Sequence, residues 1–560
     1  MFTDGKILGT DIEICEAFSK FFENMFIQPA PFYDNDRSKR SYNNTVSTFN
    51  VNEDLVQKLL LNLDVSKGPG SDGIPPSFIV KCAKSLSKPL TIIFFRSIRD
   101  GIYPSRWKEA HIVPVHKKGS KTTIEHYRPI SILNIFGKVF EKIVYDNIYP
   151  VIMQGVPNEQ HGFVRGRSTT SNLSVFVSDV LQGMSSHGQV DVVYTDFEKA
   201  FDRVDHVILL KKLQELGIHG DLLRWIRSYV TNRQQAVVVG GCRSNFIHVP
   251  SGVPQGSLLG PLLYAAFLYD INECFEHSKF LLYADDKKVY LEIKNIEDCV
   301  KLQRDLNNLS VYYHKNRIGV NVAKCQQISF SRRNKTIEFN YTLNNNKLTK
   351  ISSVRDLGVI LDAKLTFSAH IESIVNRAYR NLGFVIRTCK PFTDEMCVRM
   401  LYFAYVRSTL EYCSSIWNPQ YIIYDHSIES IQQKFVKYLN FKFTKVSQDY
   451  TESCMHHKLK TLHNRRLLCD MSLLHDICSG AIDCPTLVNN ILRFLAPSLR
   501  TRNTKQKLFY VPTVRTNYAS NCVNFRLPNT YNNKFSVVDI FHLSKNAFKN
   551  QIITILNNKL

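Results

Sequence analysis

The sequence predicts an α+β fold followed by a mainly helical C-terminal region. Two observations carry this prediction. Up to about residue 361, short runs rich in β-branched and aromatic residues alternate with amphipathic stretches, the pattern of strands and helices that share a core. Beyond that point the apolar spacing is mainly helical. With 560 residues, of which 44% are hydrophobic, the chain can bury several cores, and its length suggests about three or four domains.

Helices are predicted where apolar residues recur three or four positions apart. The first, at 11–26, has Asp11 as its candidate N-cap. The helix at 78–98 is expected to break at Pro89, because proline lacks the backbone donor that a helix interior needs. The other predicted helices cover 52–61, 133–148, 168–184, 206–216, 221–230, 257–271 and 296–314. A polar stretch at 33–44 is expected to be a linker.

Strands are predicted where apolar and β-branched runs lie between turn residues. Gly240 and Gly241 separate two such runs, at 234–239 and 245–249, and predict a hairpin. The remaining predicted strands cover 111–115, 190–195, 327–331, 337–343 and 353–361. Loops are expected at 67–75, 116–121 and 251–256, where turn residues or basic residues cluster.

The run from Leu281 to Tyr290 is the most informative part of the chain. Apolar residues flank two adjacent carboxylates, Asp285 and Asp286, which predicts a hairpin with both near its tip. Such neighbours repel each other unless a cation lies between them, and Mg²⁺ prefers oxygen ligands of this kind. The site would then serve phosphate chemistry. The alternative interpretation is a solvated turn.

Asp196 ends the strand predicted at 190–195 and supplies a third carboxylate. Carboxylates at strand ends and hairpin tips can share two ions about 3.5–4 Å apart, the arrangement used for in-line phosphoryl displacement. The alternative for Asp196 is a helix N-cap. Asp202 and Asp205 are expected to be helix caps or surface carboxylates rather than ligands.

The chain is strongly basic, with a formal net charge of +22, which favours a polyanionic partner such as nucleic acid. Residues 391–560 hold 21 Lys and Arg against 11 Asp and Glu, so this part is the denser in positive charge. It is expected to contact nucleic acid. General solubility is the alternative explanation of the charge.

The fourteen cysteines include no C-x-x-C pair, and no secretory signal follows Met1. We therefore expect an intracellular protein, in the nucleus or the cytoplasm, with reduced thiols. The segment from Cys454 to Cys469 has zinc-ligand residue types, but their irregular spacing argues against a zinc site. The apolar run at 258–269 is too short to span a bilayer and is expected to be a buried helix.

Three further motifs carry a resemblance to a known family. YTDFEKAFD at 194–202, GVPQGS at 252–257 and YADD at 283–286 resemble motifs A, B and C of reverse transcriptases, in that order. The resemblance extends to non-LTR, jockey-like retrotransposon polymerases through stretches at 67–75, 127–131, 160–163, 356–359 and 410–417. It covers residues 10–440, and the rest more weakly.

The resemblance implies a two-ion site, with Mg²⁺ or Mn²⁺ held by Asp196, Asp285 and Asp286 and by the backbone carbonyl of Phe197. It also implies that Phe201 is a steric gate, whose ring would clash with a ribose 2′-OH and so select dNTPs. Ordinary core packing is the alternative for Phe201.

The resemblance further implies a grip on the triphosphate by Lys117 or Lys118 with Arg128, for which a solvated basic loop is the alternative. It implies that Lys324 protonates the leaving pyrophosphate and that Gln255 lies beside the nucleotide and template. Gly256 would lie against template or primer, and Arg165 and Arg167 would contact the template backbone. For Arg165 and Arg167 a solvated loop is the alternative, and Lys324 could be an ordinary surface lysine.

The implied architecture is a right-hand polymerase with a ferredoxin-like palm sheet. Its expected parts are an N-terminal helix and linker (1–48), fingers and palm (49–335), a thumb or connection region (336–445) and a basic C-terminal region (446–560). We expect the endonuclease domain usual in this group to be absent. No RNase H carboxylate set or zinc knuckle is expected either.

The predicted function is RNA-directed DNA synthesis, with an RNA template, a DNA primer and dNTPs as partners and no membrane. Intact motifs favour retained chemistry over a decayed copy. One rival is a non-catalytic nucleic-acid-binding remnant of a truncated element. Another is a viral RNA-copying polymerase or an intron maturase, which Phe201 and the stretch at 410–417 disfavour. The sequence predicts no oligomeric state.

Overall fold

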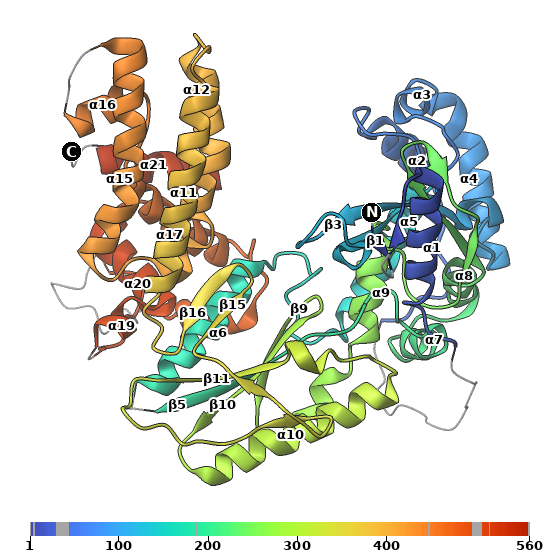
Figure 1. Cartoon of the computed structure of the whole chain (residues 1–560), viewed down its shortest axis with the longest axis horizontal. Coiled ribbons are helices and arrows are strands. Elements are labelled where there is room, and N and C mark those ends of the chain that lie inside the picture. Colours follow the sequence, from blue (N-terminus) through green and yellow to red (C-terminus); the bar gives the residue numbers. More distant parts are fainter. Residues whose placement is uncertain are drawn as a thin grey trace.

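Figure 1 shows the computed structural model of the chain, which describes residues 2–3, 6–29, 44–185, 188–445, 449–494, 507–514 and 516–557. Apart from Asn44, the linker predicted at 33–44 lies outside these residues. Two mixed sheets form one part of the molecule and a tower of helices forms the other. None of the helices within the described ranges has the length and apolar character needed to cross a membrane.

The central sheet has five strands in the order β14-β11-β5-β10-β9. They span Thr349–Lys350 (β14), Gln326–Ser331 (β11), Gln189–Thr195 (β5), Asp286–Ile293 (β10) and Lys279–Tyr283 (β9). β5 is antiparallel to both β10 and β11, and β10 is antiparallel to β9. The strand that ends at Asp196 is therefore paired along both edges, in the middle of the sheet.

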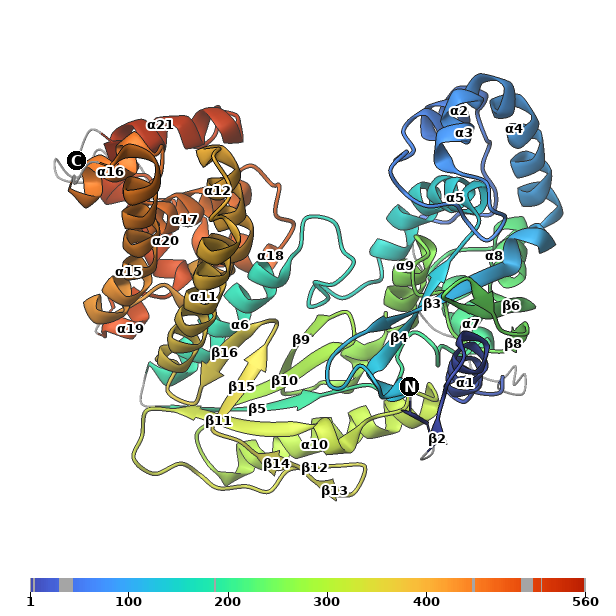
Figure 2. The same cartoon turned by 45° about the horizontal axis from the view of Figure 1, so that its top comes forward.

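Both faces of the central sheet are covered by helices, as Figure 2 shows. Val192 belongs to the core on one face, where α6 (Thr169–Met184) packs. Its neighbour Val193 belongs to the core on the other face, where α10 (Ile296–Lys315) packs. Because successive side chains of a strand point to opposite faces, a strand buried on both sides reads as a nearly continuous apolar run, which explains the valines of β5.

The second sheet holds the loop predicted at 116–121 at one end. Its strands are Tyr127–Ile132 (β4), Glu109–His116 (β3), Arg233–Val239 (β6), Cys242–Arg243 (β7) and Ile247–Val249 (β8). β3 is antiparallel to β4 and parallel to β6, while β7 and β8 both return along β6. The hairpin predicted around Gly240 and Gly241 is thus confirmed, although its return strand is divided.

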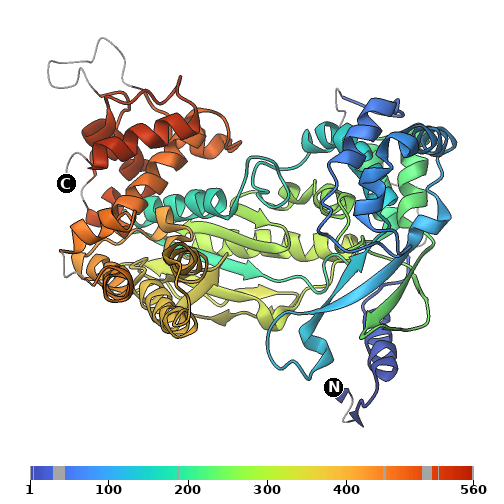
Figure 3. The same cartoon turned by 90° about the horizontal axis from the view of Figure 1, so that it is seen from above.

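The N-terminal helix α1 (Asp11–Glu23) packs against the second sheet, beside β6 and β7 (Figure 3). Phe18 and Phe22 of this helix share a small core with Ile112 and Val237 of the sheet. The N-cap is Thr10 rather than Asp11. The Thr10 side chain accepts a hydrogen bond from the Glu13 backbone N–H, and the Glu13 side chain accepts one from the Thr10 backbone N–H.

A second core packs a group of helices against one face of the central sheet. Its helices are Glu53–Leu61 (α2), Pro76–Lys81 (α3), Ala83–Asp100 (α4), Ile135–Met153 (α5), His206–Glu215 (α7), Gly220–Val230 (α8) and Leu259–Phe267 (α9). The helix break expected at Pro89 is wrong, because the break falls at Cys82. The Cys82 N–H donates the last hydrogen bond of α3 to the Phe78 carbonyl, and the Cys82 carbonyl accepts the first hydrogen bond of α4. Pro89 lies inside α4 on its exposed side.

The C-terminal region is mainly helical, as predicted, and forms the tower in Figure 1. It contains Ser368–Thr388 (α11), Glu395–Tyr402 (α12), Ser408–Glu411 (α13), Ser414–Trp417 (α14), Ile422–Leu439 (α15), Tyr450–His456 (α16), Leu462–Cys478 (α17), Pro485–Ile491 (α18), Asn517–Ser520 (α19), Val523–Thr530 (α20) and Lys545–Asn557 (α21). These helices share one core with α6, so the tower is packed on one face of the central sheet.

Between the central sheet and the tower lies a short hairpin, Ser353–Asp356 (β15) and Val359–Asp362 (β16). The single strand predicted at 353–361 is therefore two strands that turn at Leu357 and Gly358. The strand predicted at 337–343 is wrong except at its end, Thr342–Leu343 (β12), which pairs with Asn346–Lys347 (β13). Its neighbour Tyr341 instead buries its ring and donates to Asp191.

A buried ion pair fastens this hairpin to the central sheet. Lys288 of β10 donates to the carboxylate of Asp356, and the hydroxyl of Tyr194 donates to the same oxygen at 3.2 Å. Lys288 and Asp356 are almost inaccessible to solvent. Burial lowers the pKa of Lys288, and the neighbouring carboxylate opposes that shift.

Removing one member of this pair is expected to be far more harmful than removing both. Asp356→Ala leaves the Lys288 charge buried without a partner, which should cost about 3–5 kcal/mol. The double variant Lys288→Met/Asp356→Leu replaces the pair by apolar groups and should cost much less. The shift of the urea midpoint measures both. Equal losses in the two variants would contradict this account.

His161 is buried beneath β9. Its backbone N–H donates to Leu282 at 2.9 Å, and its ring Nδ1 lies 2.8 Å from the hydroxyl of Ser171. Burial, assisted by the positive charges of Arg167 and Lys288, lowers the pKa of His161 from 6.5 to about 3. The folded protein therefore holds this imidazole neutral.

The shifted pKa of His161 predicts a loss of stability in acid. Between pH 6.5 and about 3 the unfolded chain binds a proton that the folded chain refuses, so stability falls as pH drops through 6.5, by about 1.4 kcal/mol per pH unit for this residue. His161→Asn should remove this contribution, so that the free energy of unfolding, measured from urea curves, falls less steeply between pH 6.5 and 5. An unchanged slope would show that His161 is not the group responsible.

Candidate functional site

The two adjacent carboxylates lie at the turn between β9 and β10, as predicted. Tyr283 pairs with Asp286, so Ala284 and Asp285 form the two-residue turn. Ala284 has φ +59°, as the first position of a tight hairpin turn requires, and this conformation is strained for a residue with a Cβ. Backbone strain of this kind is often found at functional sites.

The segment at 160–163 supports this turn from below. The side-chain oxygen of Gln160 accepts hydrogen bonds from the backbone N–H groups of Gly162 (3.0 Å) and Ala284 (3.3 Å). Gly162 approaches so closely that a Cβ there would lie 2.2 Å from the backbone nitrogen of Ala284. This supporting role could not be predicted from local sequence patterns, because the contact joins segments more than a hundred residues apart.

Asp196 lies beside the turn because β5 pairs with β10, with Thr195 opposite Lys287. Asp196 is not a helix N-cap: the next residue, Phe197, forms an isolated bridge with Val320, and turns rather than a helix follow. The ammonium group of Lys324 lies 2.8 Å from the Asp196 carboxylate. The structure thus brings together the residues predicted for the metal site and the predicted general acid.

The carboxylates influence one another electrostatically. Desolvation by the surrounding protein raises the pKa of Asp286 to about 6, although its side chain is open to solvent on one side. The negative charges of Asp285, Asp356 and Asp196 raise this pKa further. Such a group is costly to ionise without a nearby cation. The pattern is the one expected of carboxylates gathered at a catalytic site.

The chemistry of this donor set suits a hard divalent cation, since it consists of carboxylates with a neighbouring backbone carbonyl. Within the described ranges, however, no group of three or more His, Cys, Asp or Glu side chains is already arranged as a metal site. Asp196 is instead paired with Lys324. The ligands are therefore near one another but not preformed.

The site opens into a cleft of about 420 Å³. Its lining includes Asp196, Asp286, Lys118, Lys324 and Asp356. It is bounded by the central sheet, by the loop between β3 and β4, and by the β15–β16 hairpin. A cleft lined by both carboxylates and lysines can hold metal ions together with a polyphosphate.

The predicted phosphate-binding lysines come from the second sheet. Lys118 lines the cleft. Partial burial lowers the pKa of Lys117, as do the charges of Arg128 and Lys324, while Asp196 and Asp285 oppose the shift. Lys117 therefore lies within electrostatic reach of the carboxylates on the central sheet. Both Lys117 and Lys118 are thus placed where they could contact a phosphate group.

Phe201 is set in an aromatic cluster at the edge of the site. Its ring stacks on Tyr264 at 4.8 Å and meets the edge of Phe163 at 5.8 Å. Only part of the side chain is buried. The ring is thus held by its neighbours and partly exposed, and its role as a steric gate stays a prediction.

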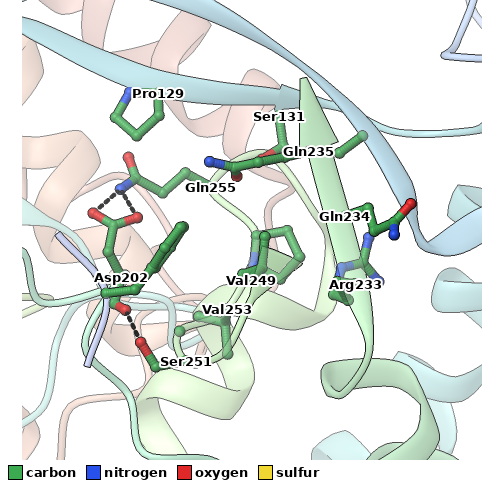
Figure 4. A pocket seen from close by; sticks show the side chains of 14 residues that line it. Pro129, Ser131, Asp202, Arg233, Gln234, Gln235, Val249, Ser251, Val253 and Gln255 are labelled. Atoms are coloured by element: carbon green, nitrogen blue, oxygen red, sulfur yellow. Dashed lines mark hydrogen bonds between the residues drawn. The ribbon is translucent and has the colours of Figure 1, made fainter. Parts of the chain in front are cut away.

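Gln255 and Gly256 belong to the loop that precedes α9. The Gln255 carbonyl accepts a hydrogen bond from the Ser131 backbone at 2.7 Å, and its side-chain amide donates to both oxygens of Asp202 (Figure 4). Gly256 has φ +122°, and a Cβ there would lie 2.7 Å from the carbonyl of Ser131, so only glycine fits. The loop is held tightly against β4.

Asp202 differs from the prediction, which expected a helix cap or a surface carboxylate. It is buried, with 8% of its surface exposed, and burial raises its pKa to about 6. Asp205 does cap a helix: it accepts from the backbone of Val207 and Ile208 at the start of α7, and it pairs with Arg317 at 2.8 Å. No local pattern distinguishes these two aspartates.

The two arginines of the 165–167 loop have different surroundings. Arg167 donates to the backbone carbonyls of Asn158, Gln160 and Asp483, so the predicted template contact is not supported for this residue. Arg165 pairs with Asp146 at 2.9 Å and remains more than half exposed. Its predicted contact with template stays a prediction.

Residue Lys199 was not singled out by the sequence. It adopts φ +49° within the turn after Asp196 and lies 5.2 Å from the ring of Phe21 in α1. Its pKa is lowered by burial and by the charges of Lys117 and Lys324, which places it on the same positive side of the site.

Comparison with known proteins agrees with the site. Residues 115–386 match the family model "Reverse transcriptase (RNA-dependent DNA polymerase)". The chain is 30% identical to the RNA-directed DNA polymerase from mobile element jockey of Drosophila melanogaster, over 58% of this chain and 36% of that protein. It is 29% identical to the probable polymerase from transposon X-element of the same species, with 58% and 36% covered.

The chain spans about a third of the length of these curated relatives. Among solved structures, an apo telomerase from Candida tropicalis aligns with a TM-score of 0.32 and 13% sequence identity. The alignment covers 51% of this chain and 60% of the telomerase chain. The family match contains every motif that carries the resemblance seen in the sequence between Tyr194 and Asp286. Residues 115–386 are therefore similar to a reverse transcriptase domain, and the two relatives are described as an RNA-directed DNA polymerase of a mobile element and a probable one of a transposon.

Proposed function

We propose that this chain is an RNA-directed DNA polymerase that extends a primer 3′-OH with dNTPs on an RNA template. The observation that carries the proposal is the meeting of carboxylates and lysines in one cleft. Asp196 and Asp286 line it from neighbouring strands of the central sheet, next to the turn with Asp285, and Lys118 lines it from the loop of the second sheet.

In this proposal the central sheet is the palm of a right hand, and the second sheet with α1 to α5 and α8 forms the fingers. The order β11-β5-β10-β9, with α9 and α10 sharing the core on one face, supports the predicted ferredoxin-like palm. The β15–β16 hairpin and the helices from α11 onward would form the thumb or connection region to residue 445. The basic region beyond it would bind nucleic acid.

Asp196, Asp285, Asp286 and the carbonyl of Phe197 would hold two Mg²⁺ or Mn²⁺ ions, which when bound would activate the primer 3′-OH and neutralise charge on the phosphates. Lys324, which is paired with Asp196 at 2.8 Å, would be the residue that donates a proton to the leaving pyrophosphate. Lys117 or Lys118, with Arg128, would neutralise the triphosphate. The Phe201 ring would occupy the space of a ribose 2′-OH.

The RNA template, the DNA primer and an intracellular location are part of the proposal. The net charge of +22 supports binding to nucleic acid. All fourteen cysteines, each of which lies in the described part of the chain, are free thiols, as a reducing compartment favours. The rival proposal, a non-catalytic nucleic-acid-binding protein, gains some support from the Asp196–Lys324 pair and the ligands that are not preformed.

Primer extension distinguishes these two proposals. Purified protein with an RNA template, a DNA primer, dNTPs and Mg²⁺ or Mn²⁺ should extend the primer, and Asp285→Ala should lower the rate by at least about 100-fold because it removes charge where the ions bind. Asp64→Asn, an exposed aspartate far along the chain, is the matched control and should extend normally. Salt-sensitive binding without any extension would instead favour the rival.

Phe201 is expected to set the choice of sugar. Phe201→Ala should raise the incorporation of rNTPs relative to dNTPs by on the order of tenfold or more, because the space for a 2′-OH opens while dNTP contacts remain. The ratio of kcat/KM for rNTP and dNTP measures this. Phe163→Leu, which only removes the ring beside Phe201, should shift the ratio less. An unchanged ratio in Phe201→Ala would mean that the ring is core packing only.

A further inference from the structure

Asp202 and Gln255 form a largely buried polar contact between the turn after Asp196 and the loop before α9. The Gln255 Nε2 lies 3.0 Å from Oδ1 and 2.9 Å from Oδ2 of Asp202 (Figure 4). Asp202 directly follows Phe201, the predicted sugar gate. The contact therefore joins two parts of the proposed nucleotide site.

The backbones on both sides of this contact are fixed. Val253 N–H donates to the Phe201 carbonyl, and Gly252 N–H donates to Val204, each at 2.8 Å. The hydroxyl of Ser251 donates to the Asp202 carbonyl at 2.7 Å. The two segments cannot slide past each other, so the position of the carboxylate relative to the Gln255 side chain is set before any ligand binds.

A carboxylate can only accept hydrogen bonds, and this decides which way the Gln255 amide faces. The NH₂ group must point toward Asp202, because the reversed amide would place its oxygen against a negative charge. Within the described parts of the chain, the side-chain oxygen of Gln255 has no recorded protein donor. That oxygen is the group left for a ligand.

The burial of Asp202 supports a specific role rather than a solvated one. A carboxylate with 8% exposure is costly to bury, and among the described residues Gln255 is the side chain that donates hydrogen bonds to it. The positive charges of Lys199 and Arg203 lower its pKa, but burial outweighs them. A protein that needed only packing at this position would be better served by an apolar or neutral residue.

We propose that Asp202 is a positioning residue that orients the Gln255 amide so that its oxygen faces the nucleotide site as a hydrogen-bond acceptor. The group it would meet is a donor on the incoming deoxynucleotide, a sugar hydroxyl or a base N–H. This inference rests on the proposed polymerase function. Asp202 itself touches neither the nucleotide nor the reacting atoms.

Asp202→Asn tests the orientation with little change of shape. Asparagine can accept from Gln255 or donate to it, so the amide is free to face either way, and a charge-assisted hydrogen bond becomes a neutral one. We expect KM for dNTP to rise about fivefold while kcat changes less than twofold. Asp205→Asn is the matched control: it removes the charge that pairs with Arg317 while asparagine still caps α7, so it should lower the melting temperature without moving KM.

A double-variant cycle shows whether Asp202 acts through Gln255. In a Gln255→Ala background, Asp202→Asn should leave KM unchanged within twofold, because no amide remains to be oriented. The same fivefold rise in both backgrounds would overturn the inference. So would an unchanged KM in the single variant, or a fall in kcat and melting temperature together, which would indicate a structural role only.

Failure of this inference can be told from failure of the proposed function. Primer extension by the wild type, with Asp285→Ala as its negative control, tests the function alone. The coupling between positions 202 and 255 can also be measured in the urea midpoints of the same four proteins, without any catalysis. Additive midpoint shifts would overturn the Asp202–Gln255 interaction even in a protein that polymerises.

Discussion

The antiparallel pairing of β5 with β10 is the constraint on which the site depends. Thr195 lies opposite Lys287, so the residue after one and the residue before the other, Asp196 and Asp286, meet at the same end of the sheet. A slip of one residue would send these side chains to opposite faces. Because both faces of the sheet are buried by α6 and α10, such a slip would also expose much of two cores, and the register is strongly specified.

The gathering of carboxylates has to be balanced, and the chain does this with lysines placed on several sides. Lys324 pairs with Asp196, and Lys288 pairs with Asp356 behind the site. Lys117 approaches from the other sheet. The exposed pair is the one that a metal ion can displace, whereas the buried pair is part of the framework that holds the β15–β16 hairpin.

Much of the site could be predicted from the sequence because its signals are local. The hairpin around Asp285 and the strand before Asp196 are short apolar runs that end in carboxylates, and both are confirmed. What the sequence could not show are contacts made across long separations. Asp202 resembles a cap like Asp205 until the loop that carries Gln255 folds onto it. Pro89 and the stretch at 337–343 were misjudged for a related reason, since tertiary packing overrode a local preference.

The guanidinium of Arg167 connects the segment around Gln160, which supports the β9–β10 turn, to Asp483 in the C-terminal tower. It donates to the carbonyls of Asn158 and Gln160 on one side and of Asp483 on the other, and the Asp483 N–H returns to Gly166 at 3.2 Å. Gln160 in turn holds the backbone of Ala284. Three residues thus link the C-terminal tower to the turn that carries Asp285. Because these contacts are continuous, a displacement of the tower near Asp483 would strain the hydrogen bond that Ala284 donates to Gln160.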